Sequence, residues 1–441
     1  MSDVAATTSR RSPLFAVFST VFIDLIGFSI LIPVFPLLID PNPQAPFRVT
    51  PADWSFGTGL IMLGWLQAIY PFCIFLAAPI LGQLSDRFGR RPVLALSIGG
   101  TAFGYVIFAI GILTKNIPLL FLGRGIDGLT GGNLAVAQAA IGDISTDANR
   151  AKNFGMIGAA FGLGFIIGPY LGGRLSAPNT SFYGLFHTPG WFGATTPFWF
   201  AAGLAAMNCA LVTFAFPETI KHKDPHRALA LGQSVRNVVN GFRSPRLRAP
   251  LLVGLLWGGG FTFFTTFFGV YLKNRFGFSQ SKTGDFFAIV GLFIAIMQGL
   301  VVGLISKRLA DYKVLRFSLF ALAAVMAVYF AAHTSTPLYM VIPFFALFQG
   351  LSQANLGALI SRSAEPGRQG EAMGIYSSVS SLAQVPASAL VGYITGSITS
   401  NTPIVVSAIL IALAGLAFNL LFNPKHVNSR QGDPVPAMPA A

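Results

Sequence analysis

Long apolar runs, separated by short polar gaps, dominate the chain of 441 residues. A membrane-spanning helix needs about 20 consecutive apolar residues, because the hydrocarbon core of a bilayer is about 30 Å thick. Runs of this kind lie at 14–38, 58–81, 93–113, 118–142, 153–173, 196–216, 250–272, 282–305, 314–332, 338–360, 371–395 and 402–422. The pattern predicts an all-α membrane protein with twelve transmembrane helices.

The composition excludes an ordinary soluble fold. Charged residues make up 10% of the chain and hydrophobic residues 53%, whereas soluble domains carry about 25% charged residues. Most of the chain must therefore lie where charges are excluded.

The charges that remain are strongly unbalanced. The chain has 29 Lys and Arg against 15 Asp and Glu, a formal net charge of +14. The basic residues fall in the gaps between apolar runs, which indicates a membrane-orientation signal and argues against nucleic-acid binding. With the N-terminus inside, the cytoplasmic segments hold 22 Lys and Arg and the external gaps hold five. We therefore expect both termini in the cytoplasm and a location in the cell membrane, the inner one if the source is bacterial.

The runs fall into two sets of six. They predict an N-terminal bundle at 14–216, a cytoplasmic linker at 217–249 that includes an amphipathic helix on the membrane, and a C-terminal bundle at 250–422. Short cytoplasmic tails at 1–13 and 423–441 complete the chain, the second of them disordered.

An internal repeat supports this division. The segment 128–134 recurs as 350–356 with a shift of 222 residues, and the same shift carries Asp143 onto Glu365. GLISKRLAD at 303–311 is a weaker copy of GQLSDRFGR at 82–90.

The sequence gives no sign of a metal, a cofactor or an enzyme active site. Cys73 and Cys209 lie inside apolar runs, and the histidines lie in or beside loops without a full set of metal ligands. Signatures of hydrolases, metalloproteases and ATP-binding loops are missing from the sequence. A membrane-embedded enzyme or a non-transporting sensor is therefore the less favoured alternative to a transporter.

The segment GQLSDRFGRRP at 82–92 follows the second run. Its glycines would let helix ends pack closely, Asp86 could bind a helix N-terminus, and Arg90 and Arg91 could clamp a carboxylate or a lipid phosphate. The segment resembles the signature loop between spans two and three of the major facilitator superfamily. That resemblance implies two six-helix bundles around a central cavity, and a cytoplasmic gating latch formed by Gly82, Asp86, Gly89, Arg90 and Arg91.

Two further motifs resemble those of proton-coupled exporters. In the fifth run, small residues recur every four positions and give a smooth face for helix packing. The ending of this run is similar to the mark of exporters that exchange substrate for protons, and its residues are Gly164, Gly168, Pro169, Gly172 and Gly173. Asp24-x-x-Gly27 with Pro33-x-x-Pro36 resembles a motif of the twelve-span drug:proton antiporters.

Within that group the chain most resembles the tetracycline:proton antiporters, over nearly its whole length. The similar segments are STVFIDLIGFSILIPVFP, LSDRFGRRPVLALS, FLGRGIDGLTGG, FGLGFIIGPYLGG, PET and RQGEAMG. Three differences stand out. Those exporters carry an acid just before a tyrosine in span three and another in span nine. This chain has Gly104 before Tyr105, no acid at 314–332, and Asp127 where the family usually has a small or apolar residue.

Charges inside the spans are the candidate proton-coupling residues, since an ionisable group in hydrocarbon costs about 2.5–3.5 kcal/mol or more. They are Asp24, Asp127 and Arg124, and Asp285 near the start of the eighth run reads as a loop-side cap. We hypothesise that a desolvated carboxylate takes up a proton, loses its attraction for Arg124 and lets the bundles rock. Asp24 is the first candidate and Asp127 the second. A static pair between Asp127 and Arg124, three positions apart, is an equally favoured interpretation.

Aromatic and amide side chains predict a cavity for a flat, amphiphilic compound, although packing would also explain the phenylalanines. The candidates are Asn133, Gln138, Phe264, Phe267, Gln349 and Asn355. The sequence thus predicts a monomeric, proton-coupled exporter of a drug or tetracycline-like molecule, working by alternating access in the lipid bilayer. A proton-coupled importer of a small metabolite is the alternative.

Overall fold

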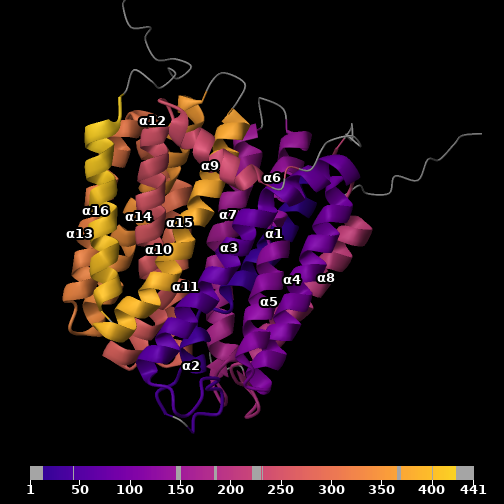
Figure 1. Ribbon diagram of the computed structural model, residues 1–441, viewed down its shortest axis with the longest axis vertical. Coiled ribbons are helices and arrows are strands. Elements are labelled where there is room, and N and C mark those ends of the chain that lie inside the picture. Colours follow the sequence, from indigo (N-terminus) through magenta and orange to yellow (C-terminus); the bar gives the residue numbers. More distant parts are fainter. Residues whose placement is uncertain are drawn as a thin grey trace, which may run out of the picture. The chain divides into compact units, whose positions relative to one another are not determined.

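A computed structural model describes residues 13–42, 44–145, 150–182, 186–220, 230, 232–364, 369–399 and 401–423. This part of the chain is almost entirely helical (Figure 1), apart from a hairpin of two short antiparallel strands, β1 (Ser181–Phe182) and β2 (Phe186–His187). Glu365, residues 221–229 of the predicted linker, and most of both predicted tails lie outside the described residues.

Helices occupy every apolar run that the sequence predicts to span the membrane. In the first half they are α1 (Pro13–Ser29), α2 (Phe35–Leu38), α3 (Phe56–Phe88), α4 (Arg90–Leu113), α5 (Ile117–Thr130), α6 (Asn133–Ile144), α7 (Arg150–Leu175) and α8 (Thr196–Ala215). In the second half they are α10 (Arg248–Phe276), α11 (Gln280–Ile296), the π-helix η1 (Met297–Val302), α12 (Gly303–Arg308), α13 (Asp311–Ala331), α14 (Ser335–Ser363), α15 (Gln369–Ser397) and α16 (Thr402–Leu421). The linker contains α9 (Gln233–Arg243).

Seven helical segments among the described residues are by themselves long and apolar enough to cross a membrane. They are α3, α4, α8, α10, the continuous segment Gln280–Ile305, α13 and α16. Other predicted runs are divided, such as the one shared by α5 and α6, or carry many small and polar residues, such as α7 and α15. The predicted class, an all-α membrane protein, is confirmed.

The turn between α3 and α4 depends on a glycine. Gly89 ends α3 and begins α4 with φ of 115°, a conformation that side chains with a Cβ rarely adopt. The turn brings the last residues of α3 directly beside the first turn of α4, which places Asp86 near Arg90.

The chain divides into two compact units that differ from the predicted halves. Unit 1 comprises 1–59, 76–231 and 277–292, and unit 2 comprises 60–75, 232–276 and 293–441. Unit 1 thus includes the beginning of α11, and unit 2 includes a segment of α3. The predicted domain boundaries describe the sequence halves and stay a prediction.

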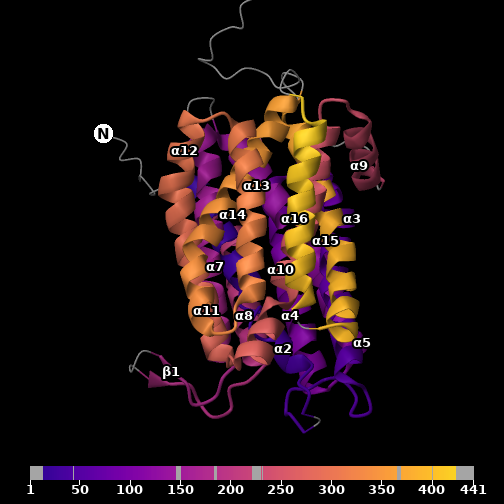
Figure 2. The same cartoon turned by 90° about the vertical axis from the view of Figure 1, so that its left-hand side faces the viewer.

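In unit 1, α1 packs against α7 and α8, and α4 packs against α5 and α8. In unit 2, α10 packs against α15 and α16, and α13 packs against α14 and α16. Figure 2 shows α9 at the edge of unit 2, and α9 contacts α15 and α10.

Candidate functional site

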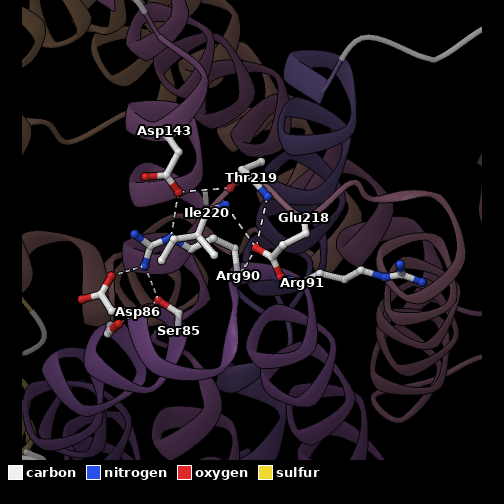
Figure 3. Close-up of polar contacts among 9 residues, drawn as sticks. Ser85, Asp86, Arg90, Arg91, Asp143, Glu218, Thr219 and Ile220 are labelled. Atoms are coloured by element: carbon white, nitrogen blue, oxygen red, sulfur yellow. Dashed lines mark hydrogen bonds and ion pairs between the residues drawn. The ribbon is translucent and has the colours of Figure 1, made fainter. Parts of the chain in front are cut away.

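Arg90 is the centre of a polar cluster at the turn between α3 and α4, here named the α3–α4 cluster (Figure 3). Its guanidinium donates from Nη1 to Asp86 Oδ1 and to Ser85 Oγ, both at 2.6 Å. Its Nε donates to Asp143 Oδ2 at 2.9 Å. Arg90 is buried, with 6% of its surface exposed, so these contacts replace most of its hydration. The guanidinium therefore joins the end of α3 to the end of α6.

Glu218 caps the first turn of α4 from a distant part of the sequence. Its Oε1 accepts from the backbone N–H of Arg90 at 2.8 Å, and its Oε2 accepts from that of Arg91 at 3.4 Å. The first N–H groups of a helix have no partner within the helix, and a carboxylate there is favoured by the helix dipole. The neighbouring Thr219 donates its hydroxyl to Asp143 Oδ2 at 3.1 Å. The segment after α8 is thereby fixed to both α4 and α6.

The predicted latch residues have different surroundings. Asp86 pairs with Arg90, while the carboxylate at the helix N-terminus in this cluster is Glu218. Arg91 donates its guanidinium to the carbonyl oxygen of Thr213 in α8 and not to a carboxylate. Gly82 was expected to allow close packing, yet a Cβ there would meet no atom within 4 Å. Glu218, Ser85 and Asp143 also belong to the cluster, although the latch motif does not predict them.

A second polar cluster lies inside unit 1, and we name it the buried charge cluster: Asp24, Thr101, Arg124, Asp127 and Asn133. Arg124 Nη1 donates to Asp127 Oδ2 at 3.0 Å, and both residues are buried. The hydroxyl of Thr101 in α4 lies 3.4 Å from that of Thr130 in α5. The pair that the i, i+3 spacing suggested is therefore present.

Asp24 has a different kind of partner. Its Oδ1 accepts from Asn133 Nδ2 at 2.8 Å, which joins α1 to the start of α6. Among the described residues Asp24 forms no ion pair. Asn133, expected in a substrate cavity, is thus the hydrogen-bond donor to the first candidate proton carrier.

The absence of a side chain at Gly104 and the presence of Asp127 belong to one packing arrangement. A Cβ on Gly104 would lie 2.8 Å from the carbonyl oxygen of Gly123 and 3.1 Å from Asp127 Cβ. The absence of a side chain at 104 lets α4 approach α5, and Asp127 occupies the adjoining space. Two of the three differences from the tetracycline antiporter pattern, an acid missing before Tyr105 and an extra one at 127, are therefore neighbours in space.

The glycines of the predicted antiporter motif form a packing face on α7. A Cβ on Gly164, Gly168 or Gly172 would overlap Leu25, Ser29 or Ile30 of the α1 segment. The Ser29 hydroxyl also donates to the carbonyl oxygen of Gly164 at 2.9 Å. The small residues thus serve the close packing that their spacing suggested.

The end of this motif contacts α11 within unit 1. A Cβ on Gly173 would lie 3.0 Å from Gly284 Cα, and one on Gly284 would lie 2.5 Å from the carbonyl oxygen of Pro169. Arg174 Nη2 donates to both carboxylate oxygens of Asp285 at 2.9 Å. Asp285 was expected to act as a loop-side cap, and the structure shows instead that it pairs with an arginine 111 residues away.

The candidate cavity residues in unit 2 are mostly enclosed. Phe264 and Phe267 are buried, and the ring of Phe264 lies against Phe268, Tyr329 and Phe345. These contacts favour the packing interpretation for Phe264.

The amide candidates differ from one another. Asn355 donates to the carbonyl oxygen of Leu351 in its own helix at 2.8 Å. Gln349 is also buried, and its Oε1 has no hydrogen-bond partner in the described part of the chain. Gln138 in unit 1 is exposed. A substrate role for these residues stays a prediction.

A family model described as the Major Facilitator Superfamily matches residues 17–384 and 299–439. The chain belongs to this superfamily. It is 31% identical to the class C tetracycline resistance protein of Escherichia coli over 384 residues, which cover 85% of this chain and 87% of that protein.

Solved structures share the superfamily fold. The crystal structure of the human organic anion transporter MFSD10 covers 93% of this chain and 99% of its own, with a TM-score of 0.69 and 21% identity. That of a D-xylose–proton symporter covers 93% and 98%, with a TM-score of 0.69 and 16% identity. The chain is thus a multi-pass membrane transporter that acts on small molecules, and it is not an enzyme.

Arg90→Ala is expected to destabilise the transporter by about 2–3 kcal/mol, because two carboxylates and a serine lose a charged donor. Thermal unfolding of the purified protein in detergent measures the effect. The adjacent Arg91→Ala is the matched control and should change stability by about 0.5 kcal/mol or less, since its guanidinium contacts one exposed carbonyl. Equal effects of the two substitutions would contradict the assignment of Arg90 as the centre of the α3–α4 cluster.

Gly172→Ala is expected to destabilise the transporter by about 1–3 kcal/mol, because the new methyl group would overlap the backbone of Ile30. Gly125→Ala in α5 is the control, since a Cβ there meets no atom within 4 Å. It should be neutral or stabilising by up to about 1 kcal/mol. Unfolding transitions of the two variants, recorded side by side, test the difference, and a harmless Gly172→Ala would refute the packing face.

Proposed function

We propose that this transporter exports a small amphiphilic compound in exchange for protons, and that Asp24 carries the proton. The observation behind the proposal is the composition of the buried charge cluster. It contains two carboxyl groups and one guanidinium, and the guanidinium is already bound to Asp127. Asp24 is left with a neutral amide as its partner.

Protonation of Asp24 removes the excess negative charge of two carboxylates over one guanidinium. Asp24 is half-buried, and a carboxylate that is partly removed from water without a cation beside it is costly, because desolvation favours the neutral form. The carboxylate of Asp127, which is paired with Arg124, belongs to the same cluster. A proton that reaches Asp24 from outside therefore removes the excess charge, while its departure restores a charge that favours a more hydrated arrangement. A group that gains and loses its charge in this way can couple proton entry to alternating access.

The antiporter motif in α7 and the relatives named as tetracycline resistance proteins support export over import. The positive charges in the predicted cytoplasmic gaps support cytoplasmic termini and, in a bacterial cell, the inner membrane. A monomer suffices for this mechanism, since both candidate clusters lie within one unit of one chain.

Transport into everted membrane vesicles tests the proposal. Tetracycline and a panel of flat amphiphilic drugs are supplied outside, and the energy source is a vesicle lumen kept acidic and electrically positive, so that protons leave as the drug enters. We expect accumulation of at least one compound and its loss on addition of a protonophore. Accumulation that needs ATP but no proton gradient would contradict proton coupling. Proton-driven uptake seen solely in right-side-out vesicles would show an importer.

A further inference from the structure

The linker helix α9 packs on unit 2 through its polar and small side chains. The Ser234 hydroxyl donates to the carbonyl oxygen of Phe75, and Asn237 Nδ2 donates to Ser378 Oγ at 3.4 Å. Gly241 lies against Ile375. These contact residues recur at i, i+3 and i+7, which is one face of a helix.

Three of the four valine and phenylalanine side chains of α9 are on another face. Val235 is 54% exposed, Val239 is 40% exposed, and the half-buried Phe242 continues their row at i, i+4 and i+7. A helix that packed for apolar burial would turn this row toward the protein. In this structure the row points away from unit 2. These side chains can therefore be buried only by an apolar medium other than the protein.

A basic row adjoins the apolar one. Arg236 and Arg243 are exposed one position after Val235 and Phe242, respectively, and Arg246 and Arg248 follow at the start of α10. These four arginines form no ion pair or hydrogen bond through their side chains with the described part of the chain. The sequence has no Asp or Glu from 225 to 284. Within the described part of the chain, no acidic side chain forms an ion pair with these arginines.

We propose that the exposed face of α9 docks on an anionic phospholipid leaflet. The apolar row would enter the boundary of the acyl chains, and the arginines would bind headgroup phosphates. The position of α9 suits this partner, because α10 begins at Arg248 and is one of the segments able to cross a membrane. Exposed valines beside arginines that form no ion pair with the described residues match the apolar and the anionic parts of a lipid surface, whereas a soluble anion would leave the valines in water.

A spin label at position 239 tests the docking in the full-length protein. Val239→Cys is labelled in a Cys73→Ala, Cys209→Ala background and reconstituted into nanodiscs of phosphatidylglycerol or phosphatidylcholine. In phosphatidylglycerol we expect the label to be reached by oxygen and shielded from a water-soluble relaxation agent. In phosphatidylcholine we expect greater access of the aqueous agent.

The double substitution Arg236→Gln, Arg243→Gln should lower the ratio of docked to undocked α9 by about 25-fold, since each basic residue near an anionic surface contributes about fivefold. Both positions are exposed, so the fold should persist, as judged by a monodisperse gel-filtration profile. The matched control Lys313→Gln, Arg316→Gln removes two exposed cations from α13 and should leave the label unchanged.

Three outcomes would overturn the proposal. The label could be equally accessible to water in both lipids, which excludes docking or indicates a protein partner. The control could act like the α9 variant, which indicates a general charge effect. Inositol hexakisphosphate could shield the label equally well in lipid-free detergent, which indicates a site for a soluble anion.

Discussion

Asp24→Asn is expected to abolish proton-driven accumulation while leaving the protein folded. The asparagine amide can still hydrogen-bond to Asn133, but it cannot take up and release a proton. One proton moving down a potential of 100 mV releases about 2.3 kcal/mol, which supports a concentration ratio of about 50-fold for a neutral substrate. The variant should show a ratio near one in everted vesicles.

Exchange of labelled for unlabelled substrate provides the control for this result. Such exchange needs substrate binding and movement of the site but no net proton flux, so Asp24→Asn should retain it. Asp285→Asn is the matched acid substitution, and it should preserve accumulation because Asp285 forms its ion pair with Arg174 outside the buried charge cluster. Full accumulation by Asp24→Asn would remove Asp24 from the mechanism.

Asp127→Asn is expected to have its largest effect on stability. The substitution leaves Arg124 buried without its carboxylate, and breaking a buried pair from one side typically costs about 3–5 kcal/mol. Unfolding of the purified protein should show a much larger loss for Asp127→Asn than for Asp24→Asn, which removes a charge without a cationic partner among the described residues.

A double-mutant cycle identifies the cause. Arg124→Gln combined with Asp127→Asn removes both charges, so the double variant should be more stable than the sum of the two single losses predicts. Additive losses would show that Arg124 and Asp127 do not stabilise each other. Loss of proton coupling in a stable Asp127→Asn protein would make Asp127 the carrier instead.

Short-range features of this transporter were predictable from the sequence. The helices follow the apolar runs because hydrophobic length and helical hydrogen bonding are local properties. The Arg124–Asp127 pair follows from residues three apart on one helix. The glycine face of α7 follows from the four-residue spacing.

Long-range contacts were not predictable in the same way. Asn133 meets Asp24 across 109 residues, and Glu218 caps α4 across about 128 residues. Both contacts depend on how the helices pack. From residue type alone, Asn133 was expected to line a substrate cavity and Glu218 was expected to have no role. The division into units shows the same limit, since 60–75 and 277–292 join the units opposite to their sequence halves.

The position of Gly104 shows how packing changes the meaning of a sequence difference. Taken one at a time, a missing acid in α4 and an additional acid in α5 suggest a loss and a gain of function. The close contact of Gly104 with Asp127 makes them one arrangement, with the carboxylate supplied from α5. The sequence contained both residues but not their distance.

Proton release on substrate binding tests the central claim most directly. Purified protein in weakly buffered detergent solution receives each compound of the drug panel, and a pH indicator records the protons released per substrate bound. We predict release of about one proton by the unmodified protein, none by Asp24→Asn, and release retained by Arg90→Ala. Substrate binding without proton release by the unmodified protein, or undiminished release by Asp24→Asn, would contradict the account.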